Sequence, residues 1–331
     1  DAIERGEDRI EFKHAMQKLG IEMAKSEVAY TVDQAVDIAE QLGYSHKSVR
    51  KTMPNKIIGI MCPEVVSEYY ARIVTTLTEH LMKHGYFALT ALSDFAESQE
   101  EQIIMQFGHM QISGIICITE QTSIGDILNK AFAKYPLIPT IIIGLNYEDQ
   151  KHDVISVDER LGMRRIAEHL LSLGHKRIAF IGDMLVQQRL GFLQDCLNTH
   201  GIALDPQYIA IGSERYEQGG YLRMKQLLSL PQTPTAVVAG YDALALGAYR
   251  AIKESGRNVP EDISLTGFDD SSLCAFLPTA LTTVNCNIEE MSRIAATILL
   301  KNIRDPSYHV VQTVAIQPNF IVRESTGVSK Q

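Results

Sequence analysis

The sequence predicts an α/β fold of two doubly wound lobes, each built on a parallel sheet, preceded by a small α-helical segment. The first observation is that short apolar runs alternate with amphipathic helices from residue 57 to about residue 270. Continuous apolar runs of this kind are typical of parallel strands covered by helices on both faces. The second observation is that the pattern restarts at "DVISVD" (153–158), which gives two units of similar size. Ligands bind at the carboxyl ends of such strands, so we expect a binding cleft between the units.

The first unit contains four apolar strands and the helices between them. In chain order these are the strand "KIIGIMCPEV", the helix "SEYYARIVTTLTEHLMKHGY", the strand "FALTALSD", a helix through Gln106, the strand "ISGIICI", a further helix and the strand "IPTIIIGLN". The first of these helices is predicted to end at Gly85. Glycine and proline occur only as local breaks between elements, and no low-complexity linker interrupts the unit.

The second unit repeats this order of elements. Its strands and helices are "DVISVD", the helix "RLGMRRIAEHLLSLGH", "RIAFIGD", a helix to His200, "QYIAIGS", a helix, "PTAVVAG", the helix "ALALGAYRAIKESG" and "ISLTGFDD".

The composition is that of a globular protein of the cytoplasm. The chain has 331 residues, enough for two or three domains, with 45% hydrophobic and 21% charged residues. No apolar run is long enough to span a membrane. The charged N-terminus predicts that no signal peptide is present. The five cysteines show no metal-binding spacing, so we expect reduced core thiols and neither metal nor cofactor.

The overall net charge of −9 conceals a local basic patch. Residues 45–56 carry Lys47, Arg50, Lys51 and Lys56 with no acidic residue, whereas residues 1–44 hold ten acids and five bases. Contact with phosphates depends on local charge, so this patch suits nucleic acid. The alternative is a solvated linker that happens to contain lysines.

No catalytic pattern is found in the sequence. It lacks a Walker loop, H-E-x-x-H, G-x-S-x-G and Cys-x-x-Cys, and the glycines of "GYDALALGAY" are too far apart for a phosphate turn. The ten histidines are scattered along the chain, and we interpret them as surface or helix-end residues. We therefore expect no catalytic residues and no enzymatic activity.

Several stretches together resemble the LacI/GalR family of transcriptional regulators. "VISVDERLGMRRIAEHLLSLGHKRIAFIG" resembles the family's valine–aspartate, glycine and "HL-x-x-x-GH-(R/K)-(R/K)-I" signature. "PTAVVAGYDALALGAYRAIKESGRNVPEDISLTGFDD" continues the match, and "LTTVNCNIEEMSRIAATILL" and "IQPNFIVREST" complete it. The resemblance covers about residues 57 to 326 in order.

The resemblance implies a periplasmic-binding-protein-like core of type I with two lobes, three chain crossings and a small-molecule effector in the cleft. The core would form a homodimer and follow an N-terminal headpiece that binds operator DNA. The expected boundaries are residues 1–53 for the headpiece, 57–155 plus 287–304 for the N-lobe, and 156–286 plus 310–331 for the C-lobe.

Two alignments of the headpiece remain open. In the first, residues 32–53 form a helix-turn-helix, because "DIA…GYSHKSV" resembles the family's "D-(V/I)-A…G-V-S-x-x-T-V". Gly43 then permits the turn and Ser45 caps the second helix, which would enter the major groove. In the second alignment the same residues are the third helix and hinge, and Met53 takes the place of the family's minor-groove leucine. Both alignments place one set of residues against DNA, namely Ser45, His46, Lys47, Ser48, Arg50, Lys51 and Met53. A third possibility is a headpiece that no longer binds DNA, since residues 1–44 are net negative and repel phosphates.

The family's effector contacts map onto both lobes. The residues expected to bind the effector are Tyr69, Tyr70, Gln188, Arg189, Arg215, Tyr241 and Asp269. Asp269 matches the acid that accepts ligand hydroxyls, since a carboxylate can accept from two hydroxyl groups at once. Gln187, Gln188 and Arg189 are alternatives for the family's sugar-binding arginine.

The pocket departs from the family pattern at three positions. Tyr241 replaces an asparagine, Arg215 replaces a stacking aromatic residue, and Gly144 replaces an aspartate. The expected effector is therefore a sugar, a sugar phosphate or a related metabolite. Arg215 raises the hypothesis that the ligand is phosphorylated or otherwise anionic. The competing functions are a ligand sensor that has lost specific DNA binding, and an enzyme on the same core.

Overall fold

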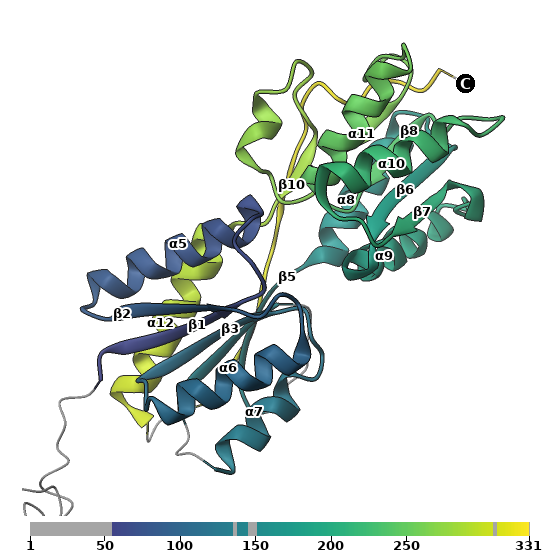
Figure 1. Cartoon of the computed structure of the whole chain (residues 1–331). Helices are drawn as coiled ribbons and strands as arrows, with labels where there is room; N and C mark the ends of the chain where they lie inside the picture. The colour runs from purple at the N-terminus through teal and green to yellow at the C-terminus, as the bar shows by residue number, and fades with distance from the viewer. Residues whose placement is uncertain (1–54, 135–137, 145–150, 307–309, 331) are drawn as a thin grey trace, which may run out of the picture. The chain divides into compact units, whose positions relative to one another are not determined.

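The computed structural model describes residues 55–134, 138–144, 151–306 and 310–330. The headpiece predicted for residues 1–53, with every residue expected to contact DNA, lies outside these ranges. The described ranges form the predicted α/β core, whose two parallel sheets define an N-lobe and a C-lobe (Figure 1).

The N-lobe is built on a six-stranded sheet in the order β11-β5-β4-β3-β1-β2. Each neighbouring pair of strands in it is parallel. Its strands are β1 (Ile57–Cys62), β2 (Phe87–Leu92), β3 (Gly114–Thr119), β4 (Thr140–Gly144), β5 (Asp153–Val157) and β11 (Thr313–Ile316). Its helices are α5 (Glu68–Lys83), α6 (Glu97–His109), α7 (Ile124–Phe132) and α12 (Ile288–Arg304).

These helices cover both faces of the N-lobe sheet. Helices α5 and α12 pack together on one face, and α6 and α7 pack together on the other (Figure 1). Alternate residues of β3 consequently enter different cores: Ile116 and Ile118 pack with α5, while Ile115 and Cys117 pack with α6 and α7. The central strands are apolar on both faces for this reason, and the continuous apolar runs of the sequence follow from it.

The C-lobe is built on a four-stranded parallel sheet in the order β7-β6-β8-β9. Its strands are β6 (Ile178–Asp183), β7 (Ile209–Gly212), β8 (Ala236–Ala239) and β9 (Ser264–Thr266). Its helices are α8 (Glu159–Ser172), α9 (Gln187–Thr199), α10 (Tyr216–Leu228) and α11 (Asp242–Glu254). Helices α10 and α11 approach so closely that a Cβ at Gly247 would lie 1.8 Å from the carbonyl oxygen of Glu217, so only glycine fits there.

Three segments in the described part of the chain connect the lobes. They run from β5 to α8, from β10 (Thr283–Asn285) to α12, and from β11 to β12 (Asn319–Ile321). β10 and β12 pair antiparallel, which holds two of the connections side by side (Figure 1). The expected lobe boundaries differ from this arrangement at two strands. β5 extends to Val157, and β11 belongs to the N-lobe sheet rather than to the C-lobe because it pairs with β5.

The histidine prediction is wrong for two of the described residues, because His152 and His175 are both buried. His175 is buried, and its ring contacts Thr235 Oγ1 at 2.9 Å, Ser264 Oγ at 3.0 Å and the carbonyl oxygen of Gly327 at 3.0 Å. It therefore links α8 to the C-lobe sheet and to the C-terminal segment. The five cysteines are free and buried, as predicted. None of the helices in the described ranges has the length and apolarity needed to cross a membrane.

Candidate functional site

A cavity of about 310 Å³ lies between the two lobes. This volume is in the range of small-molecule sites. Six of the seven residues predicted to contact an effector line it, namely Tyr69, Tyr70, Arg189, Arg215, Tyr241 and Asp269. Gln188 does not, because α9 directs Arg189 into the cavity and successive helical residues point about 100° apart. Gln187 and Gln188 are both exposed, so among the three alternatives it is Arg189 that lines the cavity.

The first turn of α5 supplies the N-lobe wall. The rings of Tyr69 and Tyr70 meet edge to face, with centroids 5.1 Å apart, and Phe95 lies 5.9 Å from Tyr70. The Tyr70 hydroxyl donates a 2.6 Å hydrogen bond to Glu120 Oε1. Glu120 follows β3 directly and was not among the predicted residues. Burial raises the pKa of its carboxyl group to about 7.

Arg189 is held in the C-lobe wall by a buried ion pair. Its Nε and Nη2 donate to Glu159 Oε1 at 2.9 and 2.5 Å, and its Nη1 donates to the carbonyl oxygen of Gly240 at 2.6 Å. Nη1 also lies 3.6 Å from Asp269 Oδ1, and the guanidinium carbon lies 4.0 Å from the centre of the Phe268 ring. The orientation of this arginine is therefore fixed before any ligand binds.

Arg215 and Tyr241 converge on a third acid, Asp183, at the end of β6. Arg215 Nε lies 3.3 Å from Asp183 Oδ2, and the Tyr241 hydroxyl donates to the same oxygen at 2.8 Å. The Tyr241 hydroxyl also accepts from the backbone N–H of Tyr216 at 3.0 Å. The guanidinium carbon of Arg215 lies 4.1 Å from the ring centre of Phe95 on the N-lobe. Because Asp183 neutralises Arg215, the positive charge that suggested an anionic ligand is already compensated.

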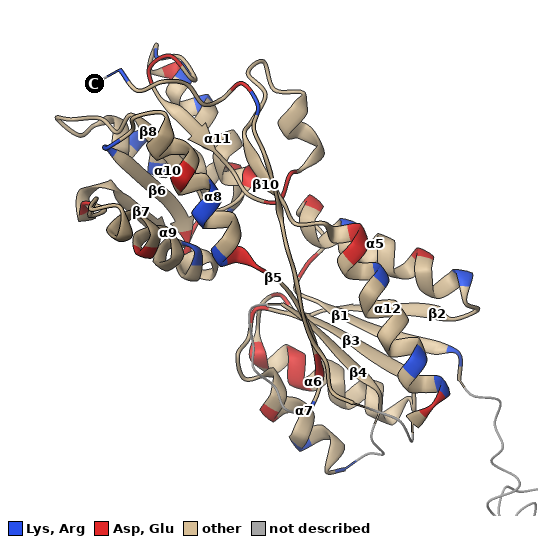
Figure 2. Cartoon of the chain, turned by 180° about the vertical axis from the view of Figure 1, so that it is seen from behind, with Lys and Arg blue, Asp and Glu red and all other residues tan. Residues whose placement is uncertain are grey.

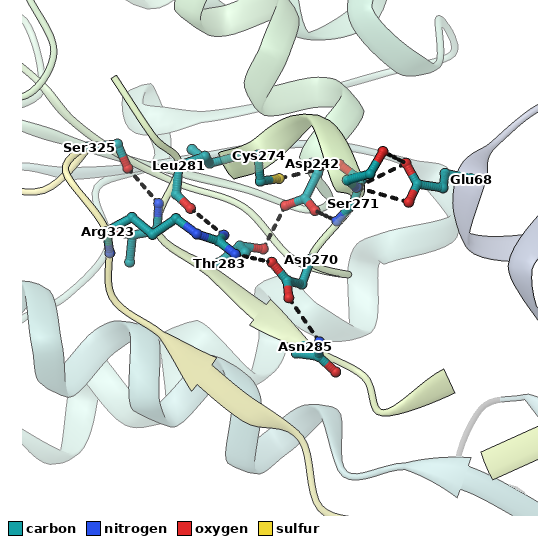
Figure 3. Close-up of polar contacts among 12 residues, drawn as sticks. Glu68, Asp242, Asp270, Ser271, Cys274, Leu281, Thr283, Asn285, Arg323 and Ser325 are labelled. Atoms are coloured by element: carbon teal, nitrogen blue, oxygen red, sulfur yellow. Dashed lines mark hydrogen bonds and ion pairs between the residues drawn. The ribbon is translucent and has the colours of Figure 1, made fainter. Parts of the chain in front are cut away.

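The loop after β9 carries Asp269, which lines the cavity, and Asp270, which Figure 3 shows between Arg323 and Asn285. Asp269 and Asp270 have φ angles of 107° and 53°, a conformation that costs non-glycine residues energy and is found at functional sites. The Asp270 carboxylate accepts from Arg323 Nη2 at 2.7 Å and from Asn285 Nδ2 at 2.8 Å, both on connecting segments.

The same loop contacts the opposite lobe. The backbone N–H and hydroxyl of Ser272 donate to the Glu68 carboxylate on α5 at 2.8 to 3.0 Å (Figure 3). Arg72 of α5 donates to the backbone carbonyl of Asp270 at 3.3 Å. The loop thus joins the cavity wall, the connecting segments and α5.

The close packing around Gly144 explains why this position carries glycine where the family pattern has an aspartate. A Cβ at this position would lie 2.1 Å from the carbonyl oxygen of Thr119 on the neighbouring strand. No side chain fits at that distance, so an aspartate is excluded at the end of β4 for steric reasons.

The comparisons agree with this architecture. A periplasmic binding protein-like domain model matches residues 167–326. The ribose operon repressor of Haemophilus influenzae is 25% identical over 300 residues, covering 88% of this chain and 89% of that protein. Catabolite control protein A of Staphylococcus xylosus is 26% identical over 285 residues, covering 82% of this chain and 83% of that protein.

A solved structure has the same two-lobed architecture. The LacI family transcriptional regulator from Enterococcus faecium with bound ribose is 25% identical and superposes with a TM-score of 0.73, covering 83% of this chain and all of that one. Signature motifs, two-lobed core and relatives of similar length together show that this chain resembles the regulators of the LacI/GalR family.

Proposed function

We propose that this protein is a cytoplasmic DNA-binding regulator, a repressor, whose operator affinity is controlled by a small metabolite bound between the lobes. The single observation that carries the proposal is the cavity lined from both lobes by Tyr70, Arg189 and Asp269. A molecule that contacts both walls stabilises one arrangement of the lobes over others. In a homodimer this arrangement sets the spacing of the paired headpieces and changes operator affinity by about 1–3 kcal/mol.

The proposed effector is polyhydroxylated and is not an anion. Carboxylates and an arginine on the walls suit hydroxyl groups. One similar structure has ribose bound, and one similar protein is a ribose operon repressor. The phosphorylated ligand suggested by Arg215 loses its support because Asp183 lies beside that arginine. The named relatives are regulators, and we propose that this chain likewise has no enzymatic activity.

The DNA-binding half of the proposal is tested by a gel shift with duplexes from upstream of the gene and its neighbours. We expect a dimer to form a sequence-specific complex whose affinity falls steeply with salt, because the basic patch contacts phosphates. Arg50→Ala and Lys47→Ala should weaken binding and reduce the salt slope. Lys225→Ala, an exposed lysine of α10, is the matched control and should leave binding unchanged.

Two results would contradict this part of the proposal. A monomeric protein that binds no duplex would be a ligand sensor without DNA binding. Affinity that does not respond to loss of Arg50 or Lys47 would remove the basic patch from the interface.

A further inference from the structure

The two lobes present carboxylate oxygens to the cavity that accept no hydrogen bond from the described residues. Glu120 on the N-lobe uses Oε1 to accept from Tyr70, and its Oε2 has no donor. Asp269 on the C-lobe has only a long contact from the Cys286 thiol to Oδ1, at 3.7 Å, and the 3.6 Å ion pair with Arg189 at the same atom, which leaves Oδ2 without a donor. Both acids lie close to Tyr69, whose pKa is raised mainly by burial and further by Cys286, Asp269 and Glu120. A ligand between them must therefore supply hydrogen-bond donors.

The arginines of the cavity offset the charge of Glu120 only in part: Arg189 and Arg215 both lower the pKa of its carboxyl group, but each is paired with another acid. Arg189 is shared by Glu159 and Asp269, Arg215 lies beside Asp183, and Arg72 pairs with Glu289 at 2.7 Å. Within the described ranges Glu120 forms no ion pair. Acidic positions flank the connecting segments on both lobes, near β5 and β10 (Figure 2). An ionised Glu120 is consequently a negative charge on the cavity wall that has no ion-pair partner of its own among the described residues.

Aromatic rings line the cavity beside this carboxylate, and Arg215 already lies over two of them, Phe95 and Tyr216. Tyr69, Tyr70 and Tyr216 line the same cavity, and Phe95 packs against Tyr70. The faces of such rings attract cations, with an energy of about 0.5–2 kcal/mol that grows as water is excluded. A carboxylate beside tyrosine rings favours an ammonium group over a neutral hydroxyl group.

We propose that the effector is a polyhydroxylated amine whose ammonium group binds Glu120 on the N-lobe while its hydroxyl groups donate to Asp269 on the C-lobe. This inference rests on the proposed function and narrows the chemical class of its ligand.

The test uses the whole protein and four probes that differ in two groups: glucose, glucosamine, glucose 6-phosphate and glucosamine 6-phosphate. Isothermal titration calorimetry and thermal shift give the affinity for each. We expect glucosamine to bind roughly 10- to 100-fold more tightly than glucose, since hydrogen bonds to charged groups are worth about 1.5–3 kcal/mol. The phosphate group should weaken binding in both pairs.

Glu120→Gln removes the negative charge but keeps the size of the side chain, and its amide oxygen still accepts the hydrogen bond from the Tyr70 hydroxyl. In this variant the preference for glucosamine over glucose should disappear while glucose binding persists. Glu79→Gln, the same change at an exposed position of α5, is the control and should keep the preference. Calorimetry of the native protein near pH 7 in buffers of different ionisation enthalpy should also show proton release with glucosamine and little with glucose, because the bound cation lowers the pKa of Glu120.

Any result other than these expected ones overturns the inference that the effector is an amine. Equal binding of glucose and glucosamine, tighter binding of either phosphate, or a glucosamine preference that survives Glu120→Gln would each remove the ammonium site. Binding of any neutral or phosphorylated sugar would still support a cleft that senses a metabolite. No binding of any probe would overturn the amine assignment, and the gel shift would then decide the proposed function separately.

Discussion

Replacement of Arg189 by methionine should destabilise the core strongly in the absence of any ligand. The Arg189 and Glu159 side chains are only 10% and 15% exposed, and they meet at 2.5 Å. Methionine keeps the packing on Phe268 but leaves the Glu159 carboxylate and the Gly240 carbonyl without their donor. Removing one partner of a buried pair costs about 3–5 kcal/mol. This loss corresponds to a decrease of roughly 6–20 °C in Tm, at about 2–4 °C per kcal/mol for a domain of this size.

Thermal unfolding followed by circular dichroism measures this decrease in Tm. Two further variants test whether burial of the ion pair is its cause. Arg160→Met breaks an ion pair of similar length, 3.1 Å to Asp195, in which both side chains are 62% exposed. It should cost no more than about 1 kcal/mol. The double variant Arg189→Met/Glu159→Leu should recover most of the loss, because the closely paired Glu159 charge is gone and only the longer 3.6 Å contact with Asp269 stays broken. A single variant no less stable than Arg160→Met, or a double variant whose loss is the sum of the two single losses, would refute the argument from burial.

Three further predictions concern buried polar groups. Tyr241→Phe should lower the free energy of unfolding by about 1–3 kcal/mol, because Asp183 loses a buried donor; the urea midpoint should fall with an unchanged m-value, and an unmoved midpoint would contradict this. Burial lowers the pKa of His175, so its neutral form stabilises the fold above about pH 6.5 and this contribution is lost as the pH falls below that value. His175→Gln should remove that part of the pH dependence, and an unchanged profile would exclude His175 as its source. Burial raises the pKa of Glu100 to about 7, and its Oε2 lacks a partner among the described residues, so its contribution is lost as the pH rises from about 4.5 through 7. Glu100→Gln should therefore raise Tm relative to the native chain at pH 8 and much less at pH 5, and an equal change at both pH values would argue against ionisation of this residue.

The sequence predicts the sheets well because their central strands are buried on both faces and their edge strands are also apolar in sequence. The nine apolar runs from Ile57 to Thr266 correspond to β1 through β9, in order. β10, β11 and β12 escaped prediction as separate strands because their sequences, TVN, TVAI and NFI, contain polar residues and form no continuous apolar run. Their pairing depends on where the connecting segments lie, which local composition does not encode.

The candidate site was predictable only in part. Arg189 could not be distinguished from Gln187 and Gln188 because the phase of α9 depends on where that helix begins. Glu120, Glu159 and Asp183 were missed, although each ends or directly follows a strand, or begins a helix, at the carboxyl edge of a sheet. Their position along the chain could therefore have indicated them. The pairs Glu159–Arg189 and Asp183–Arg215 each join elements of the C-lobe that are separated in sequence, and local composition does not encode which of these elements meet.

The late position of β11, β12 and Arg323 has a consequence for how the molecule is made. β11 completes the edge of the N-lobe sheet, while β12 and Arg323 hold β10 and Asp270 of the C-lobe. A nascent chain released at residue 310 would lack all of them. Both lobes therefore remain unfinished on the ribosome until residues 313–323 are translated, and a premature stop before them removes the N-lobe edge strand and the partner of β10 together.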